Sequence, residues 1–376
     1  MSASTLGILF GSVLVIFYFT VHMELLWGIH RMKQPTPRLS SQPLVSVIVA
    51  ARNEEKTIGT LLECLAQQTY SKKEIIIVDD RSTDQTAKII EAYKNKIPAL
   101  TCLHIISFED DFPAKKNALR AAIQTSRGEI LCFTDADCFP PPNWIEELVG
   151  NFSHDTGLVA GYSPYIVEAP YNNILHQFIN YEELRGGIWA AGSIGLRRGW
   201  LCTGRNLAYR RSVYDEVGGF EKIKMSISGD DDMFLQLVRR ETKWKISYVL
   251  SPNSFVPTLP PKTFTTFVNQ RKRHFSASQY LNISQKLFFI FYHGANLLLF
   301  ATIPCALIFP SLFWIASFGI LKFLIDALLM VPNFSTFRTK QNFLFMEIFY
   351  IFYNTFIGPL GLIASFDWKS EAAKQK

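Results

Sequence analysis

The stretch "GEILCFTDADCFPPPNW", residues 128–144, decides the fold, because an apolar strand pattern breaks there into two acids and then three prolines. Side chains alternate between the two faces of a strand, so Asp135 and Asp137 point the same way if the strand continues through them. Two carboxylates on one side form a claw of the kind that hard divalent cations bind. The alternative is that both acids are solvated turn residues, because Asp is common at strand ends.

Strand and helix patterns alternate along the chain before this stretch. Continuous apolar runs predict buried strands, and apolar residues at helical spacing predict a helix after each of the first three. The predicted strands are 44–50, 74–80, 101–106 and 129–135, and the predicted helices are 51–68, 84–96 and 114–126. This order predicts an α/β fold with a Rossmann-like, mostly parallel sheet that is covered by helices on both faces.

Polar motifs stand at the ends of three of these strands: "ARNEE" after the first, "DDRSTD" at the second and "DAD" at the fourth. Ligands of parallel sheets gather at the carboxyl ends of the strands, and a nucleotide is the natural occupant. Neither a GxxxxGK(S/T) phosphate loop nor a GxGxxG turn is present. Phosphate charge is therefore expected to meet a metal on the acidic claw and cationic side chains such as Lys115.

Two more motifs follow downstream. In "SGDDDMFLQLVRR", residues 228–240, three acids lead into an amphipathic helix pattern, and the alternative is that they only cap that helix. "NQRKRHF", residues 269–275, is strongly basic, and the alternative is an ordinary basic stretch beside a membrane.

The N-terminal end of the chain has the pattern of a membrane-spanning helix. Residues 6–27 supply about the ~20 apolar positions that a span requires. Arg31, Lys33 and Arg38 follow them, so the positive-inside bias places the middle of the chain in the cytoplasm. A cleaved signal peptide is the rival interpretation, but a basic leading region and a small-residue cleavage site are missing.

The C-terminal third repeats the apolar pattern at 287–309, 312–331 and 342–364. The middle stretch contains Lys322 and Asp326, whose i, i+4 spacing allows them to pair on one helix face. We therefore expect two to three transmembrane helices, and the middle one is alternatively interfacial or re-entrant.

The charge distribution and the cysteine content argue against a nucleic-acid interface and against a zinc site. The net charge of +6 is expected to favour anionic lipid headgroups, and no zinc-finger, homeodomain or RNA-binding motif predicts a nucleic-acid partner. The six cysteines form no CxxC pair, so the sequence predicts no zinc site and reduced, packing thiols.

Seven motifs together resemble family 2 nucleotide-sugar glycosyltransferases. They span residues 44–278 and read, in order, "VSVIVAARNEE", "IIIVDDRSTDQT", "AKKNALRAAI", "FTDADC", "GRNLAYRRSVYDEVGGF", "SGDDDMFL" and "QRKRH". The flanking helices resemble those of membrane-anchored, ceramide-glucosyltransferase-like and polysaccharide-synthase-like members. The resemblance implies a GT-A fold at 40–280, an N-terminal transmembrane helix at 1–30, a C-terminal membrane region at 285–366 and a tail at 367–376.

The resemblance also implies roles for single residues. Asp80 matches the residue that contacts the nucleotide base, and Glu54 matches another nucleotide-side residue. Lys115 matches the lysine of the family's GK motif, although Ala114 stands where glycine is usual. By the same resemblance, Asp135 is expected to contact the ribose side and the metal, and Asp137 the metal. Asp231 is expected to be the general base. Gln270, Arg273 and His274 match the QxxRW motif, which closes over the diphosphate.

One residue differs from the family pattern, and two others are alternative candidates for the general base. His274 stands where the family has tryptophan, which changes the contacts expected at the acceptor. Asp230 and Asp232 are the fallback candidates for the base, because neighbouring carboxylates raise one another's pKa.

The expected activity is a metal-dependent, inverting hexosyl transfer with Mg²⁺ or Mn²⁺, in the synthesis of envelope glycans or glycolipids. The donor is a nucleotide-diphosphate sugar, with a UDP-sugar favoured, and the acceptor is a lipid or lipid-linked molecule. The expected location is the bacterial inner membrane, with the catalytic domain on the cytoplasmic side. Alternatives are a processive polysaccharide synthase, a nucleotidyltransferase, whose N-terminal glycine-rich phosphate loop is missing, and a non-enzymatic membrane scaffold.

Overall fold

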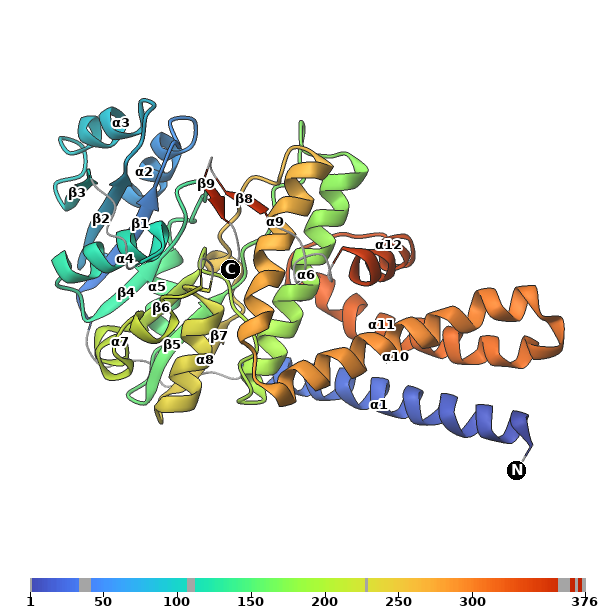
Figure 1. Cartoon of the computed structure of the whole chain (residues 1–376). Helices are drawn as coiled ribbons and strands as arrows, with labels where there is room; N and C mark the ends of the chain where they lie inside the picture. Colours follow the sequence, from blue (N-terminus) through green and yellow to red (C-terminus); the bar gives the residue numbers. More distant parts are fainter. Residues whose placement is uncertain are drawn as a thin grey trace.

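A computed structural model describes residues 2–33, 42–106, 112–226, 229–357, 366–368 and 371–373. Its centre is a seven-stranded sheet of order β3-β2-β1-β4-β6-β5-β7 (Figure 1). The strands are β1 Val45–Ala51, β2 Lys73–Asp80, β3 Leu100–Ile105, β4 Ile130–Phe133, β5 Thr156–Gly161, β6 Leu207–Arg210 and β7 Lys245–Val249. Neighbouring strands run parallel except at β6, which is antiparallel to β4 and β5. The predicted mostly parallel α/β sheet is confirmed.

Helices cover both faces of this sheet, because the side chains of each strand alternate between them. On β1, Val47 and Val49 pack in one hydrophobic core and Ile48 packs in the other. The first face is covered by α2 Ile58–Ala66, α3 Thr86–Tyr93 and α5 Trp144–Gly150, and the second by α4 Ala114–Thr125, α6 Ile174–Gly195 and α8 Asp232–Glu241. The short helix α7 Arg211–Val217 follows β6 directly.

The first sheet helix starts later than the sequence predicted. The helix predicted at 51–68 begins only at Ile58, and Asn53 takes a left-handed conformation with φ +55°. The backbone N–H groups of residues 53, 54 and 55 donate to the side chains of Ser82 (3.0 Å), Thr86 (2.7 Å) and Asp84 (3.1 Å). These bonds tie the loops after β1 and β2 together, so "ARNEE" is a loop at the edge of the sheet.

Three helices of the described residues are long and apolar enough to cross a membrane, at Ser4–Met32, Ile283–Ile308 and Pro310–Thr336. They correspond to α1 Ala3–Met32, α10 Ile283–Ile308 and α11 Ala316–Thr336, the last preceded by a 3₁₀ turn. In Figure 1 they extend together away from the sheet. Their outer faces expose many large apolar side chains, as lipid-facing helices do.

The last apolar stretch is shorter than predicted within the described residues. Helix α12 covers Phe343–Phe356, and its 14 residues rise by about 21 Å, less than the ~30 Å of a bilayer core. Residues 358–364 of the predicted stretch lie outside the described residues, as do 34–41, which contain Arg38. In the predicted tail, β8 Phe366–Trp368 and β9 Glu371–Ala373 pair antiparallel.

Helix α1 packs on the sheet domain through glycines. A Cβ atom on Gly28 would collide with the carbonyl oxygen of Gly192, and one on Gly195 would collide with the carbonyl oxygen of Gly28. The backbones of α1 and α6 therefore touch, which side chains would prevent. The N-terminal helix and the domain form one packed unit (Figure 1).

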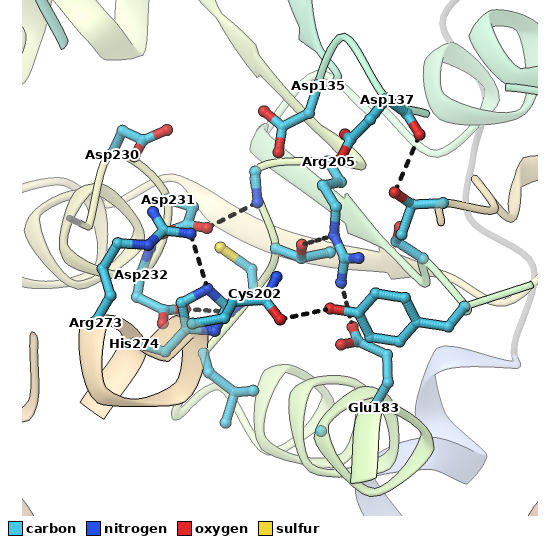
Figure 2. A pocket seen from close by; sticks show the side chains of 18 of the residues that line it. Asp135, Asp137, Glu183, Cys202, Arg205, Asp230, Asp231, Asp232, Arg273 and His274 are labelled. Carbon is cyan, nitrogen blue, oxygen red and sulfur yellow. Dashed lines mark hydrogen bonds and ion pairs between the residues drawn. The ribbon is translucent and has the colours of Figure 1, made fainter. Parts of the chain in front are cut away.

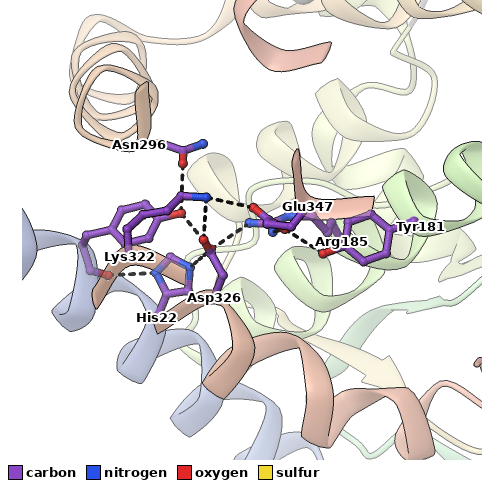
Figure 3. A network of polar contacts seen from close by, with 8 residues as sticks. His22, Tyr181, Arg185, Asn296, Lys322, Asp326 and Glu347 are labelled. Atoms are coloured by element: carbon purple, nitrogen blue, oxygen red, sulfur yellow. Dashed lines mark hydrogen bonds and ion pairs between the residues drawn. The ribbon is translucent and has the colours of Figure 1, made fainter. Parts of the chain in front are cut away.

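A fully buried charged network joins the apolar helices to α6 (Figure 3). Asp326 of α11 forms an ion pair with Lys322 (2.7 Å) on its own helix and lies 3.1 Å from His22 of α1. Lys322 also reaches Glu347 of α12 (3.1 Å), which pairs with Arg185 of α6. The predicted i, i+4 pair is confirmed, and because its charges face inward they do not prevent α11 from spanning.

Candidate active site

A single cavity of about 440 Å³ lies at the carboxyl ends of β1, β2 and β4 and extends to α6 and α12. It brings together side chains that are far apart in the sequence, from Ala50 to Tyr353. All the predicted site residues line it: Glu54, Asp80, Lys115, Asp135, Asp137, Asp231, Gln270, Arg273 and His274. Figure 2 shows the acids, Arg273 and His274 around this space.

The acidic claw forms in a different way from the one predicted. Strand β4 ends at Phe133, and Asp135 and Asp137 lie in the turn that follows, where the Cys138 N–H donates to the Asp135 carbonyl (3.2 Å). The strand predicted at 129–135 ends at Phe133, so the condition for alignment, a strand that continues through both acids, is not met. Both acids are turn residues, as the alternative expected. A turn brings both acids to the same cavity instead (Figure 2).

Lys115, at the start of α4, links two acidic motifs. Its ammonium lies 3.0 Å from Asp135 and 3.1 Å from Asp230. Burial opposes its charge, but Asp135 and Asp230 raise its pKa, so the lysine stays protonated. One cation thus holds the "DAD" turn against the "DDD" segment.

The three acids of "DDD" have different partners. Asp230 pairs with Lys115, and Asp232 accepts from the Cys202 N–H (2.6 Å). Asp231 accepts from the N–H groups of Gly204 (2.8 Å) and Asp232 (2.7 Å), and it is the N-cap of α8. The capping alternative is therefore correct for Asp231, and the same residue also faces the cavity.

Burial favours a higher pKa for each of these acids, and the neighbouring charges decide the direction of each shift. Burial and the charges of Asp135 and Glu54 raise the pKa of Asp137 to about 6. Burial would also raise the pKa of Asp135, but Lys115 outweighs it and lowers that pKa. Burial and the charge of Asp230 raise the pKa of Asp231 above its ordinary value, which makes its carboxylate a stronger base.

The residues present fit a divalent cation at the claw. The carboxylate of Asp137 is enclosed beside Asp135 and Glu54, so its charged form is disfavoured there until positive charge is added. Carboxylate oxygens are the ligands that Mg²⁺ and Mn²⁺ prefer. Asp137 and Asp135 are the residues placed to hold such an ion.

Two acids lie at the ends of the first two strands. Asp80, the last residue of β2, is buried, and its Oδ1 accepts from Arg81 Nε (2.8 Å). Glu54 follows β1, and its Oε2 accepts from the Thr57 hydroxyl (3.0 Å). Both side chains line the cavity.

The basic motif lies on α9 Phe264–Ser276. The ring nitrogens of His274 lie 3.2 Å from Arg271 Nη1 and 3.3 Å from Arg273 Nη2. Gln270 accepts from the Tyr165 hydroxyl (3.4 Å).

The sequence reasoning missed several cavity residues. Arg205 pairs with Glu183 of α6 (2.7 Å) and lies over the ring of Tyr165 (4.9 Å), and Arg271 pairs with Glu182. Arg205 stands inside the "GRNLAYRR" motif, and the adjacent acids of "YEELRGG" interrupt an otherwise apolar helix. These two motifs were the signals available in the sequence. Nothing in their spacing shows that the two segments contact each other.

A Rossmann-like sheet with acids at its strand ends and a partly antiparallel second half is the architecture of GT-A nucleotide-sugar enzymes. Residues 46–218 match the family model "Glycosyl transferase family 2", so the chain contains a family 2 glycosyltransferase domain. The solved mannosyltransferase PcManGT from Pyrobaculum calidifontis, in complex with GDP-Man and Mn²⁺, has the same fold, with a TM-score of 0.54 at 19% identity over 92% of this chain and 99% of its own.

Two curated relatives are similar in sequence. The probable glycosyltransferase YdaM of Bacillus subtilis (strain 168) is 24% identical over 350 residues, which cover 83% of this chain and 80% of YdaM. The beta-monoglucosyldiacylglycerol synthase of Synechocystis sp. (strain ATCC 27184 / PCC 6803 / Kazusa) is 26% identical over 221 residues, which cover 56% of this chain and 43% of the synthase.

Proposed function

We propose that the chain is an inverting glycosyltransferase that moves a sugar from a nucleotide-diphosphate sugar, with a UDP-sugar favoured, to a lipid or lipid-linked acceptor. The observation that carries this proposal is the shared cavity, which is lined by Glu54 and Asp80 at the strand ends and also by residues of α6 and by Tyr353 of α12. Donor and acceptor can therefore meet beside the apolar helices. The family 2 domain supports the reaction class.

In the proposed reaction, Asp231 accepts the proton of an acceptor hydroxyl. The hydroxyl oxygen bonds to the anomeric carbon as the bond from that carbon to the diphosphate breaks, which inverts the configuration. Two backbone N–H groups orient the Asp231 carboxylate, and the nearby charge of Asp230 increases its basicity. Lys115 neutralises Asp230 and Asp135 and so keeps the claw and the base in place.

At the donor, Asp80 contacts the base, Glu54 the nucleotide side, and Asp135 the ribose side. A divalent ion held by Asp137 and Asp135 would supply positive charge against the departing diphosphate. Arg273, oriented by His274, and Gln270 would close over that diphosphate. PcManGT was solved with Mn²⁺ and GDP-Man, which supports a divalent ion and makes the choice between UDP and GDP a question for the assay.

The proposed location is a membrane, with the catalytic domain on the cytoplasmic side, and the bacterial inner membrane is favoured. Three long apolar helices and the basic Arg31 and Lys33 at the C-terminal end of α1 support this placement. The synthase from Synechocystis, whose name gives a diacylglycerol glycolipid as its product, supports a lipid acceptor.

The test is a screen of UDP- and GDP-sugars with membrane lipid extracts and Mn²⁺, followed by mass spectrometry of the products. One sugar added to a lipid, with release of a nucleoside diphosphate, is expected. A ladder of products would instead establish a processive synthase, and release of pyrophosphate would establish a nucleotidyltransferase.

A further inference from the structure

A second cluster of metal-binding residue types lies on the edge strand of the sheet. Cys102 and His104 are two residues apart on β3 and so share one face of that strand. Glu91 of α3 reaches the same face. One ligand atom from each residue lies within 4.8 Å of the other two, with 3.5 Å from Cys102 Sγ and 3.1 Å from Glu91 Oε1 to His104 Nε2.

These separations match a tetrahedral zinc ion. With Zn–N at about 2.0–2.1 Å and Zn–S at about 2.3 Å, the tetrahedral angle places ligand N and S about 3.6 Å apart and ligand N and O about 3.3 Å apart. The two distances at His104 are within ~0.2 Å of those values. Three side chains with a fourth position open to solvent make a zinc site of ordinary composition.

Asp79 supplies the outer partner that metal-bound histidines need. Its Oδ2 lies 3.3 Å from His104 Nδ1, the ring nitrogen that faces away from Cys102 and Glu91. Asp79 is buried at the end of β2 and cannot turn away freely. If Nδ1 carries the proton, it donates to Asp79 and leaves the Nε2 lone pair aimed at the cluster.

We propose that Glu91, Cys102 and His104 form a zinc site that fastens the edge strand β3 to helix α3. The site is separate from the cavity, and it does not depend on the proposed reaction. Its outer partner Asp79 is adjacent in the chain to Asp80 of the cavity, so zinc would fix the strand end that carries Asp80. The sequence reasoning predicted no zinc site because the cysteines form no CxxC pair, and Glu91 joins Cys102 and His104 only through the packing of α3 on β3.

Two features of the site disfavour metal binding: the ion pair of Lys94 with Glu91, and the raised pKa of the Cys102 thiol. Lys94 lies 2.7 Å from Glu91 Oε1, but this pair is exposed, and exposed pairs are weak. Burial and the charge of Glu91 raise the pKa of the Cys102 thiol to about 12, and a bound cation would reverse that by stabilising the thiolate. Removal of Lys94 should therefore strengthen metal binding.

The test uses the full chain in detergent, stripped of metal, and titrated with Co²⁺ as a spectroscopic substitute for Zn²⁺. A thiolate-to-cobalt charge-transfer band is expected at one equivalent and should be displaced by Zn²⁺. Asp137 and Asp135 carry no sulfur, so Co²⁺ at the acidic claw gives no such band. Cys102→Ser should abolish the band, His104→Ala should weaken binding at least about 100-fold, and Asp79→Asn about 10-fold.

Two controls complete the design. Lys94→Ala should tighten binding several-fold, and Cys64→Ser, which removes another half-buried thiol, should leave the titration unchanged. Absence of the band, or a band that survives in both Cys102→Ser and His104→Ala, would overturn the proposal. Sugar transfer by metal-loaded Cys102→Ser tests the active site separately, because that variant keeps every cavity residue.

Discussion

Replacement of Asp231 by Asn removes the proposed base while keeping the shape of the side chain. The expected loss in kcat is about 10²–10⁴-fold, which is the range that a positioned general base contributes. That range corresponds to about 2.7–5.4 kcal/mol of activation free energy. Donor affinity should change little, because the nucleotide-side residues Glu54 and Asp80 line a different part of the cavity.

The structure also sets the expected effect of this substitution on stability. The Asp231 carboxylate accepts from two backbone N–H groups, whereas an Asn side chain has one acceptor oxygen, so the N–H of Gly204 or of Asp232 loses its partner. An unsatisfied buried donor costs about 1–3 kcal/mol of unfolding free energy. Relief of the repulsion between Asp231 and Asp230 offsets part of that loss.

The assay compares wild type, Asp231→Asn and Asp215→Asn, an exposed acid of α7 that serves as control. Single-turnover transfer gives the rate of the chemical step, and titration of nucleotide quenching of tryptophan fluorescence gives donor affinity. A transfer rate for Asp231→Asn within threefold of wild type would refute the assignment of the base. A loss of donor affinity as large as the loss in rate would refute its placement on the acceptor side.

Three further results are expected. In a pH–rate profile, kcat/KM should fall about tenfold per pH unit below the pKa of Asp231. This fall should begin above the ~3.9 of an ordinary aspartate, because burial and the charge of Asp230 raise the pKa of Asp231. Asp230→Asn should therefore move the fall to lower pH. Lys115→Met should reduce kcat/KM by about 100-fold or more, because it removes the cation that links Asp135 to Asp230. The control Lys88→Met, on the exposed face of α3, should leave initial rates unchanged. Lys322→Met should lower the unfolding free energy in detergent by about 3–5 kcal/mol, because it removes one of two cations that pair with both Asp326 and Glu347, Arg185 being the other. Glu347→Gln should restore part of this loss, and an equal effect of the exposed Lys340→Met would contradict this account.

Much of the fold was predictable because periodicity reports burial directly. The runs that became β1, β2 and β4 are buried and largely apolar, as strands covered by helices on both faces must be. The meeting of Glu54, Asp80, Asp135 and Asp137 followed from the rule that parallel strands present their carboxyl ends at one edge.

The remaining features depend on tertiary contacts that periodicity does not contain. The late start of α2 is caused by side chains of the next loop, which take the N–H groups of residues 53–55. The claw depends on a turn after Phe133. The Arg205–Glu183 pair joins segments from β6 and α6 that the sequence gives no reason to place together.

The glycine contact between α1 and α6 means that the N-terminal helix is not an interchangeable anchor. Because Gly28 lies against the backbone of Gly192 and Gly195, the helix that carries Glu182 and Glu183 into the cavity is held at a set position along α1. Grafting an unrelated apolar helix in place of residues 3–32 would lose this backbone contact. In the proposed membrane arrangement, the height of the cavity above the lipid headgroups would thus be specified by residues that do not line the cavity.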